Sequence, residues 1–209
     1  MTLNYNRIAG QSVERLAALS DGIFAFAMTL LVLDLRVPAA ELVHSEHDLW
    51  RALGGMAPRL LVYGMSFVTL GIFWNGQQVQ FNHLARGDRN LTWIHIAFLA
   101  SVTLIPFSTA LLAQFIRYRA ALIVYWLNIL LLGVVVYFSW RCAVLGGLLK
   151  DDLSEEVRCV VERRILAAQA LYAFGALLCV FNTYWSIAFI VLLQLNFAIA
   201  PRLRWLSWI

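Results

Sequence analysis

The chain has 209 residues, of which 62% are hydrophobic and only 13% are charged, and its mean hydropathy is +0.75. Soluble domains are about 45–50% apolar and about 25% charged, so this composition excludes a soluble globular protein and indicates an integral membrane protein. The net charge of +4 is modest, and the basic residues lie between the apolar stretches rather than in one patch. This distribution argues against nucleic-acid binding.

Motifs of several other functional classes are missing from the sequence. The three cysteines, Cys142, Cys159 and Cys179, form no CxxC pair and have no metal-ligand spacing. No GxxxxGK loop supports an ATP-driven pump. The first ten residues lack the apolar region of a cleavable signal, so we expect the first apolar stretch to be retained. No polar cluster drawn from several apolar stretches supports an enzyme, and no cofactor is expected.

Apolar windows of about 20 residues, enough to cross roughly 30 Å of hydrocarbon, predict an all-α protein with six transmembrane helices in a single domain, residues 1–209. The helices are expected at Val13–Leu35, Ala57–Phe81, Leu91–Gln114, Ala120–Ala143, Glu162–Phe181 and Tyr184–Ala200. The last two form either a tight hairpin or one broken helix. Pro106 is expected to kink the third helix rather than to form a gate. No internal repeat relates the two halves, so an inverted-repeat transporter gains no support.

The distribution of basic residues predicts the orientation. If the N-terminus is cytoplasmic, most of the 16 Lys and Arg residues fall on that side, as cytoplasmic loops require. Six spans then place both termini in the cytoplasm of a multi-pass cell-membrane protein. Lys150–Arg164 is expected to be a solvated, charged helix extension. The C-terminal residues Arg202, Arg204, Trp205 and Trp208 are expected to lie at the cytoplasmic interface.

The first helix carries most of the polar groups at membrane depth. Asp21 is the deepest carboxylate in the chain, and a charged residue within a span costs about 2.5–3.5 kcal/mol unless it finds a partner or water. A period of 3.6 residues divides the helix into two faces. One face carries Ser20, Asp21, Phe24 and Met28; the other carries Leu19, Gly22, Phe26, Thr29, Leu30 and Leu33. The second face either packs against other helices or, in several copies around an axis, lines a path with a hydrophobic constriction and a hydroxyl ring.

The same helix resembles a known family. The pattern Arg15-xxx-Leu19-Ser20-Asp21-x7-Thr29, followed by Leu-Leu-Val-Leu-Asp-Leu-Arg-Val-Pro, is similar to the signature of the endosomal/lysosomal potassium channel family (transmembrane protein 175), in its bacterial six-helix form. Gly71-Ile-Phe-Trp74 and the stretch from Leu104 to Leu112 agree with it as well. The resemblance covers about the first 115 residues.

This resemblance implies a homotetramer in membrane lipid whose first helices line a central pore for monovalent cations. Potassium is the implied permeant ion, conducted passively without the Thr-Val-Gly-Tyr-Gly filter of ordinary potassium channels. Spacing from the threonine places the family's pore and gate positions on Phe26, Leu30 and Leu33. Thr29 is the implied selectivity position. Phe26 is bulkier than the isoleucine or leucine usual there, which predicts a narrower closed gate.

The Ser20–Asp21 pair is implied to anchor the pore helix through hydrogen bonds to neighbouring helices. A buried carboxylate needs donors, and the available side chains for this network are those of Arg15, Trp74, Asn75, Gln77 and Gln78. Two residues depart from the family pattern. Leu19 replaces a phenylalanine, and Gln77-Gln78 replaces a histidine pair, so a pH response that needs an imidazole there is not expected.

Other interpretations remain open at this stage. A proton-coupled secondary transporter would use Asp21 as its titrating group, within one subunit rather than around a shared axis. A membrane scaffold without transport would leave Phe26, Thr29 and Leu33 without any effect on flux. His44 and His47 are expected to belong to a solvated external loop with no metal, and His95 to make a hydrogen-bonded helix contact.

Overall fold

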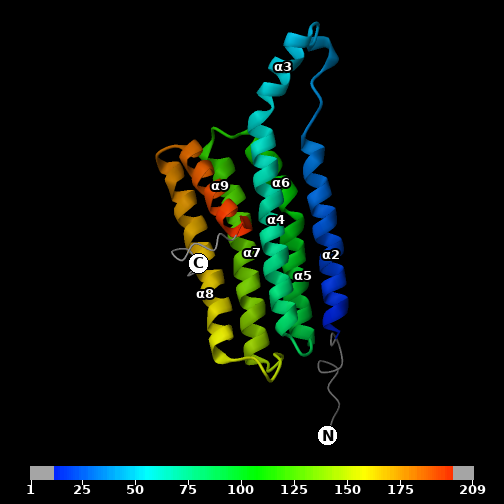
Figure 1. Ribbon diagram of the computed structural model, residues 1–209, viewed down its shortest axis with the longest axis vertical. Coiled ribbons are helices and arrows are strands. Elements are labelled where there is room, and N and C mark those ends of the chain that lie inside the picture. Colours follow the sequence, from blue (N-terminus) through cyan, green and yellow to red (C-terminus); the bar gives the residue numbers. More distant parts are fainter. Residues whose placement is uncertain (1–11, 200–209) are drawn as a thin grey trace.

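The computed structural model describes residues 12–199, which form a helical bundle (Figure 1). The elements are α2 (Val13–Leu30), η1 (Leu31–Asp34), η2 (Ala40–Leu42), α3 (Glu46–Gly55), α4 (Ala57–His83), α5 (Arg89–Thr103), α6 (Ile105–Gln114), α7 (Arg119–Leu145), α8 (Glu155–Leu177), η3 (Leu178–Val180) and α9 (Thr183–Ile199). The expected all-α fold is confirmed. The C-terminal stretch expected at the interface, with Arg202, Arg204, Trp205 and Trp208, lies outside the described residues.

Five segments are long and apolar enough to cross a membrane: Val13–Asp34, Ala57–His83, Arg89–Gln114, Arg119–Leu145 and Glu155–Val180. The third segment contains α5 and α6, which are separated at Leu104, with Pro106 in the first turn of α6. Proline fits a first helical turn but interrupts the interior of a helix, so the kink expected at Pro106 is confirmed. The sixth predicted span coincides with α9, whose 17 residues make it shorter than the other five.

Two boundaries differ from the sequence-based expectation. Helix α8 begins at Glu155 rather than Glu162, because the Ser154 hydroxyl accepts a hydrogen bond from the backbone N–H of Val157 (3.3 Å) and caps a charged first turn. The loop expected after the first span contains α3, which Ser45 caps in the same way by accepting from the N–H of Asp48 (3.2 Å). Both helix starts lie in polar sequence, where hydropathy does not indicate a boundary but a capping serine does.

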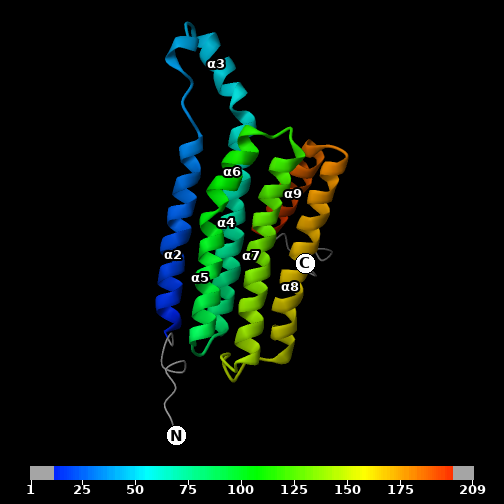
Figure 2. The same cartoon turned by 180° about the vertical axis from the view of Figure 1, so that it is seen from behind.

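Helix α4 packs against α2, α6 and α9, while α7 packs against α5, α6 and α8. Helix α2 lies at one edge of the bundle and α8 at the opposite edge (Figure 1). Seen from behind, α5, α6 and α7 form the nearer layer (Figure 2). The start of α2, the α4–α5 loop and the α7–α8 loop lie at one end of the bundle, and α3 projects beyond the other end. This arrangement leaves α2 with neighbours on one side only.

A network of neutral polar side chains joins four helices inside the bundle. The Thr109 hydroxyl of α6 donates to the Ser66 hydroxyl of α4 (2.7 Å), and the Thr69 hydroxyl lies 3.1 Å from the hydroxyl of Tyr125 on α7. Gln194 of α9 donates to Thr69 (2.7 Å). Polar groups at membrane depth need partners within the protein, because lipid tails offer none. The network therefore holds the short helix α9 to the core.

We expect Tyr125→Phe to lower the free energy of unfolding by about 1 kcal/mol, since hydrogen bonds between transmembrane helices contribute about 0.6 to 1.7 kcal/mol. The change deletes the hydroxyl next to Ser66 and Thr69 and leaves the buried ring in place. The measurement is the Tm of the full chain in detergent. Tyr184→Phe, at an exposed position, is the control. An equal Tm for both variants would contradict a stabilising role.

Candidate functional site

One face of α2 is packed against the bundle. Its buried residues, spaced three or four apart along the helix, are Leu16, Ser20, Phe24 and Ala27, and Leu31 of η1 continues the stripe. This segment contacts α4, α5 and α6. Phe24 lies against Phe98 of α5, with ring centroids 5.9 Å apart. The packed face therefore holds the helix by apolar contacts, with Ser20 as the polar exception.

The opposite face of α2 is open. Phe26 is 61% exposed and Leu33, in η1, is 70% exposed. Thr29, which lies between them along the helix, and Gly22, which lies one turn before Phe26, are exposed as well. Leu30 is half-buried at the border of this face. Large apolar side chains at such exposure indicate either a lipid-facing or a protein-facing surface. We call Gly22, Phe26, Thr29 and Leu33 the open face of α2.

Thr29 supplies the hydroxyl of the open face. Its hydroxyl donates to the backbone carbonyl of Phe26, one turn earlier, at 2.8 Å. A hydroxyl has one donor and two acceptor lone pairs, so this bond uses the hydrogen and leaves the oxygen able to accept. The Thr29 oxygen is therefore a suitable ligand for a cation that passes along this face.

The polar groups on the flank of α2 fasten it to α4. The Asp21 Oδ1 atom accepts one hydrogen bond from the Trp74 indole N–H (2.7 Å) and a second from the Gln78 amide (2.9 Å). Ser20, which is fully buried, donates to Gln77 Oε1. These bonds set the rotation of α2 about its own axis, and thereby decide which residues its open face presents.

The network continues from Gln77 to α5. With its oxygen bonded to Ser20, the Gln77 amide nitrogen lies 2.9 Å from His95 Nδ1. The amide nitrogen can only donate, so Nδ1 accepts and the neutral imidazole carries its proton on Nε2. His95 was expected to make a helix contact, but its place at the end of the Ser20–Gln77 chain was not predicted. The available signal was that His95 lies inside a predicted span, whereas His83 lies just beyond the end of one and His44 and His47 lie in a polar loop.

Two residues expected in this network lie outside it. Arg15 lies on the exposed side of α2. Its backbone N–H donates to the Ser12 hydroxyl (3.3 Å), and within residues 12–199 its side chain makes no hydrogen bond to Asp21. Asn75 is exposed on α4, and among the described residues its side chain makes no hydrogen bond to Asp21. Position 75 lies one residue after Trp74 along the helix, so its side chain points about 100° away from the carboxylate.

The histidines of the segment between α2 and α4 do not converge on a metal site. His44 precedes α3 and His47 lies in its first turn, and both are exposed. Within residues 12–199, no group of three or more His, Cys, Asp or Glu side chains is arranged to hold a metal ion.

Known proteins share this arrangement of α2 with its neighbours. The family described as "Endosomal/lysosomal potassium channel TMEM175" matches residues 15–106, the segment that contains the open face and its anchoring partners on α4 and α5. This part of the chain is therefore similar to the TMEM175 family. A crystal structure described as a lysosomal potassium-selective channel TMEM175 homolog, from Chamaesiphon minutus, superimposes with a TM-score of 0.79 at 27% identity. It covers 91% of this chain and 98% of the homolog, so the similarity extends through α7–α9.

Relatives in this family carry two different functional names. A protein of Streptomyces collinus named a potassium channel is 41% identical over 103 residues, which are 49% of this chain and 48% of that protein. A mouse protein named "Endosomal/lysosomal proton channel TMEM175" is 33% identical over 111 residues, which are 51% of this chain and 22% of the mouse protein. The matches thus span about half of the bacterial relative and about a fifth of the mouse protein.

Proposed function

We propose that the chain forms a potassium-selective cation channel, with potassium ions passing down their gradient along the open face of α2. The observation that carries this proposal is that the apolar side chains of Phe26 and Leu33 are exposed on the face opposite the packed stripe, with the Thr29 hydroxyl between them. The Streptomyces and Chamaesiphon relatives, both named as potassium channels, support the choice of ion.

One helix cannot enclose a path, so the proposal requires several copies around an axis. A homotetramer would place four open faces against one another in the middle of the membrane. Phe26, Leu30 and Leu33 would then form apolar rings, which gate an ion path by excluding water. The four Thr29 hydroxyls would replace part of the hydration shell of the ion. Asp21 keeps its structural role on the flank of each helix.

The orientation follows from charge. Arg15 and the loops at residues 84–88 and 146–154 lie at the same end of the bundle (Figure 1), and α8 begins there with a run of charged residues. Cytoplasmic loops are enriched in Lys and Arg. We therefore place this end in the cytoplasm of a cell-membrane protein, and propose that both termini are cytoplasmic, as six spans require.

Selectivity is tested at Thr29. Thr29→Ala removes the hydroxyl from every subunit and is expected to erode the discrimination of potassium over sodium, while Thr29→Ser keeps the oxygen and is expected to retain it. The measurement is potassium and sodium flux into liposomes that hold the purified chain, with the subunit number determined by native mass spectrometry. A monomer, or an unchanged ion preference in Thr29→Ala, would contradict the proposal.

A proton channel is the second candidate function, favoured by the printed name of the mouse relative. The same liposomes with an internal pH-sensitive dye separate the two ions. If the liposome interior acidifies under a proton gradient while potassium flux is absent, the permeant ion is the proton rather than potassium. The proposed pore along α2 would not be contradicted by this result.

A further inference from the structure

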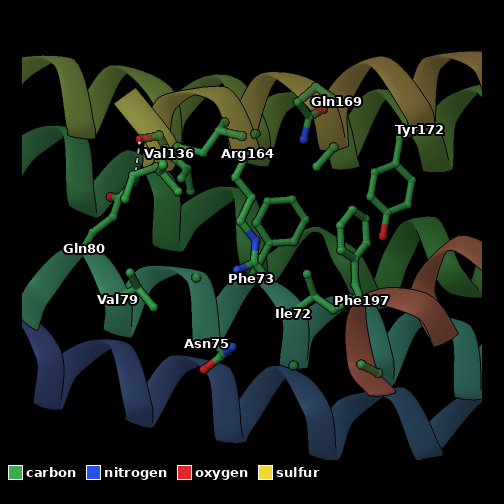
Figure 3. A pocket seen from close by; sticks show the side chains of 18 of the residues that line it. Ile72, Phe73, Asn75, Val79, Gln80, Val136, Arg164, Gln169, Tyr172 and Phe197 are labelled. Atoms are coloured by element: carbon green, nitrogen blue, oxygen red, sulfur yellow. Dashed lines mark hydrogen bonds between the residues drawn. The ribbon is translucent and has the colours of Figure 1, made fainter. Parts of the chain in front are cut away.

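A groove of about 640 Å³ lies between α4, α7 and α8, on the side of the bundle opposite the α5–α6 layer. Phe197 and Ala198, in the last turns of α9, line its upper end (Figure 3). Among the described residues, α9 ends partway along the bundle (Figure 1), and α7 forms the floor of the space between α4 and α8. We call this cavity the α4–α8 groove. Its walls are mainly valine, alanine, glycine and phenylalanine.

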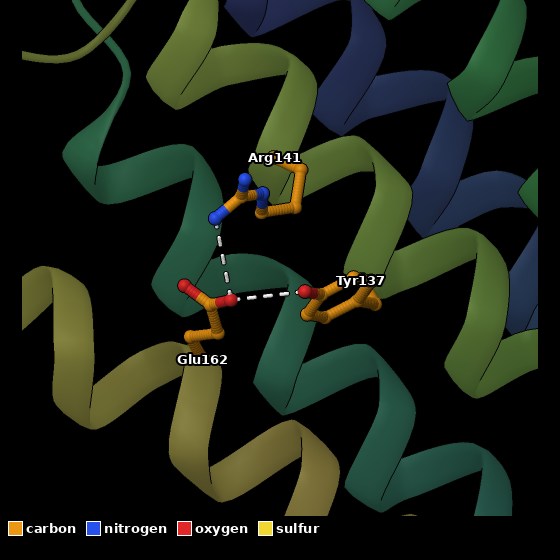
Figure 4. A network of polar contacts seen from close by, with 3 residues as sticks. All are labelled: Tyr137, Arg141 and Glu162. Atoms are coloured by element: carbon orange, nitrogen blue, oxygen red, sulfur yellow. Dashed lines mark hydrogen bonds and ion pairs between the residues drawn. The ribbon is translucent and has the colours of Figure 1, made fainter.

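An unpaired arginine enters this apolar groove. The Arg164 side chain extends from α8 toward Phe73 of α4 (Figure 3). The nearest acidic residue along α8, Glu162, faces α7 instead, where Oε1 accepts from Tyr137 (2.9 Å) and pairs with Arg141 (3.4 Å; Figure 4). No acidic side chain lines the groove, and Arg164 has no ion pair among the described residues. Arg164 is exposed, so its guanidinium is accessible to an anionic partner at the mouth of the groove.

A second polar group in the groove also lacks a partner. Gln169, a turn and a half above Arg164 on α8, has a buried Oε1 atom without a hydrogen bond. Its amide occupies the space left by Gly133 on α7, where a Cβ atom would lie 1.9 Å from Gln169 Nε2. The Gln169 amide is therefore packed against α7, and the charged group that the groove presents is the Arg164 guanidinium, roughly 7 Å lower along the helix.

The level of these groups matches a membrane interface. On α8, charged residues extend from Glu155 to Arg164, and none follows in the rest of the helix. Below Arg164 the groove is lined by Gln80 and His83, and above it by Phe67 and Tyr172. From Arg164 to Tyr172 the apolar part rises roughly 12 Å, close to one leaflet of a hydrocarbon core about 30 Å thick.

We propose that the α4–α8 groove binds one anionic membrane phospholipid, with its phosphate at Arg164 and an acyl chain along Phe67 and Tyr172. Basic pockets between transmembrane helices on the cytoplasmic side suit anionic headgroups. The chain's own residues 200–209 are a poor alternative occupant, because they carry two arginines and no acidic side chain. The site does not depend on which ion the protein conducts.

The test is lipid binding to the detergent-purified full chain, measured by native mass spectrometry with phosphatidylglycerol and phosphatidylcholine of equal acyl composition. Wild type should prefer phosphatidylglycerol. Arg164→Gln should weaken phosphatidylglycerol binding about fivefold, because one arginine near an anionic headgroup contributes about 1 kcal/mol. Arg163→Gln makes the same charge change beside the groove and should weaken this binding less than about twofold. An equal loss of phosphatidylglycerol binding in the two variants would show that general surface charge causes the effect, and would contradict a specific site at Arg164.

A variant that keeps the charge tests the groove itself. Gly71 lines the groove and a Cβ there meets no atom within 4 Å, so Gly71→Leu is expected to extend into the groove and to lose the lipid as well. A photoreactive p-benzoylphenylalanine in place of Ala168 identifies the occupant in liposomes. A crosslink to phosphatidylglycerol supports the proposal; a crosslink to residues 200–209 or to a second copy overturns it, as does unchanged lipid binding in Gly71→Leu.

Discussion

Phe26→Ala is expected to raise potassium flux through the reconstituted protein by about tenfold, since each reduction of about 1.4 kcal/mol in a barrier raises a rate tenfold. Phe26 is 61% exposed on the open face of α2, one turn before Thr29. In the proposed tetramer, its ring forms the bulkiest part of a constriction that ions cross only after losing water. Truncation to alanine widens that constriction in every subunit at once and lowers the dehydration cost. The measurement is potassium uptake by liposomes under a fixed gradient.

The matched control is Phe138→Ala on α7. Phe138 is 58% exposed, close to the value for Phe26, but it lies on a different helix away from α2. Both substitutions remove the same apolar area, so a general effect on folding or insertion would change both fluxes. Flux that rises in neither variant, or equally in both, would rule out the open face of α2 as the conduction path.

Asp21→Leu is expected to lower the free energy of unfolding by about 2–4 kcal/mol and to reduce the tetramer fraction. The carboxylate accepts two hydrogen bonds from α4, from Trp74 (2.7 Å) and Gln78 (2.9 Å), and leucine leaves both donors without an acceptor. Each unsatisfied buried donor costs about 1–3 kcal/mol, reduced here because the site is partly exposed. Asp21→Asn keeps an oxygen acceptor of the same size and is expected to lose about 1 kcal/mol. Thermal unfolding in detergent measures both variants.

The same pair of variants separates a channel from a carrier. A proton-coupled carrier would need the charge of Asp21 for each transport cycle, so Asp21→Asn would abolish flux in a protein that remains folded. A channel in which Asp21 only positions α2 keeps its flux in Asp21→Asn, because the amide oxygen still accepts from Trp74. Loss of flux in Asp21→Asn combined with unchanged flux in Phe26→Ala would favour the carrier.

Local sequence predicted the elements well where one short stretch carried the signal. Hydropathy located the five long spans, because about 20 apolar residues in a row have few other uses. Pro106 marked the break between α5 and α6. The start of α3 was missed, and the part of α8 before Glu162 was expected only as a charged helix extension within Lys150–Arg164. Both starts lie in polar sequence, where Ser45 and Ser154 decide the boundary by capping.

The site was partly visible in the sequence and partly not. Helical period placed Phe26, Thr29 and Leu33 on one face of α2, and the spacing from Arg15 to Thr29 carried the family resemblance. Donors for Asp21 were expected on α4, and Trp74 and Gln78 provide them. Arg15 and Asn75 were included because their chemistry suits a carboxylate, but their directions from the helix axis do not bring them to it.

The sequence by itself determined that this is a helical membrane protein, where its spans run and which residues share each face of the first helix. All of these depend on interactions within about 20 consecutive residues. Only the tertiary structure decided that the other described helices leave the face with Phe26 and Leu33 uncovered, and that Ser20 connects through Gln77 to His95. It also decided that Arg164 enters a groove in which no described residue forms an ion pair with it. The reason is that the exposure of a side chain and its hydrogen-bond partners depend on how helices far apart in the sequence pack together. The helical period of 3.6 residues shows which residues share a face but not what that face contacts.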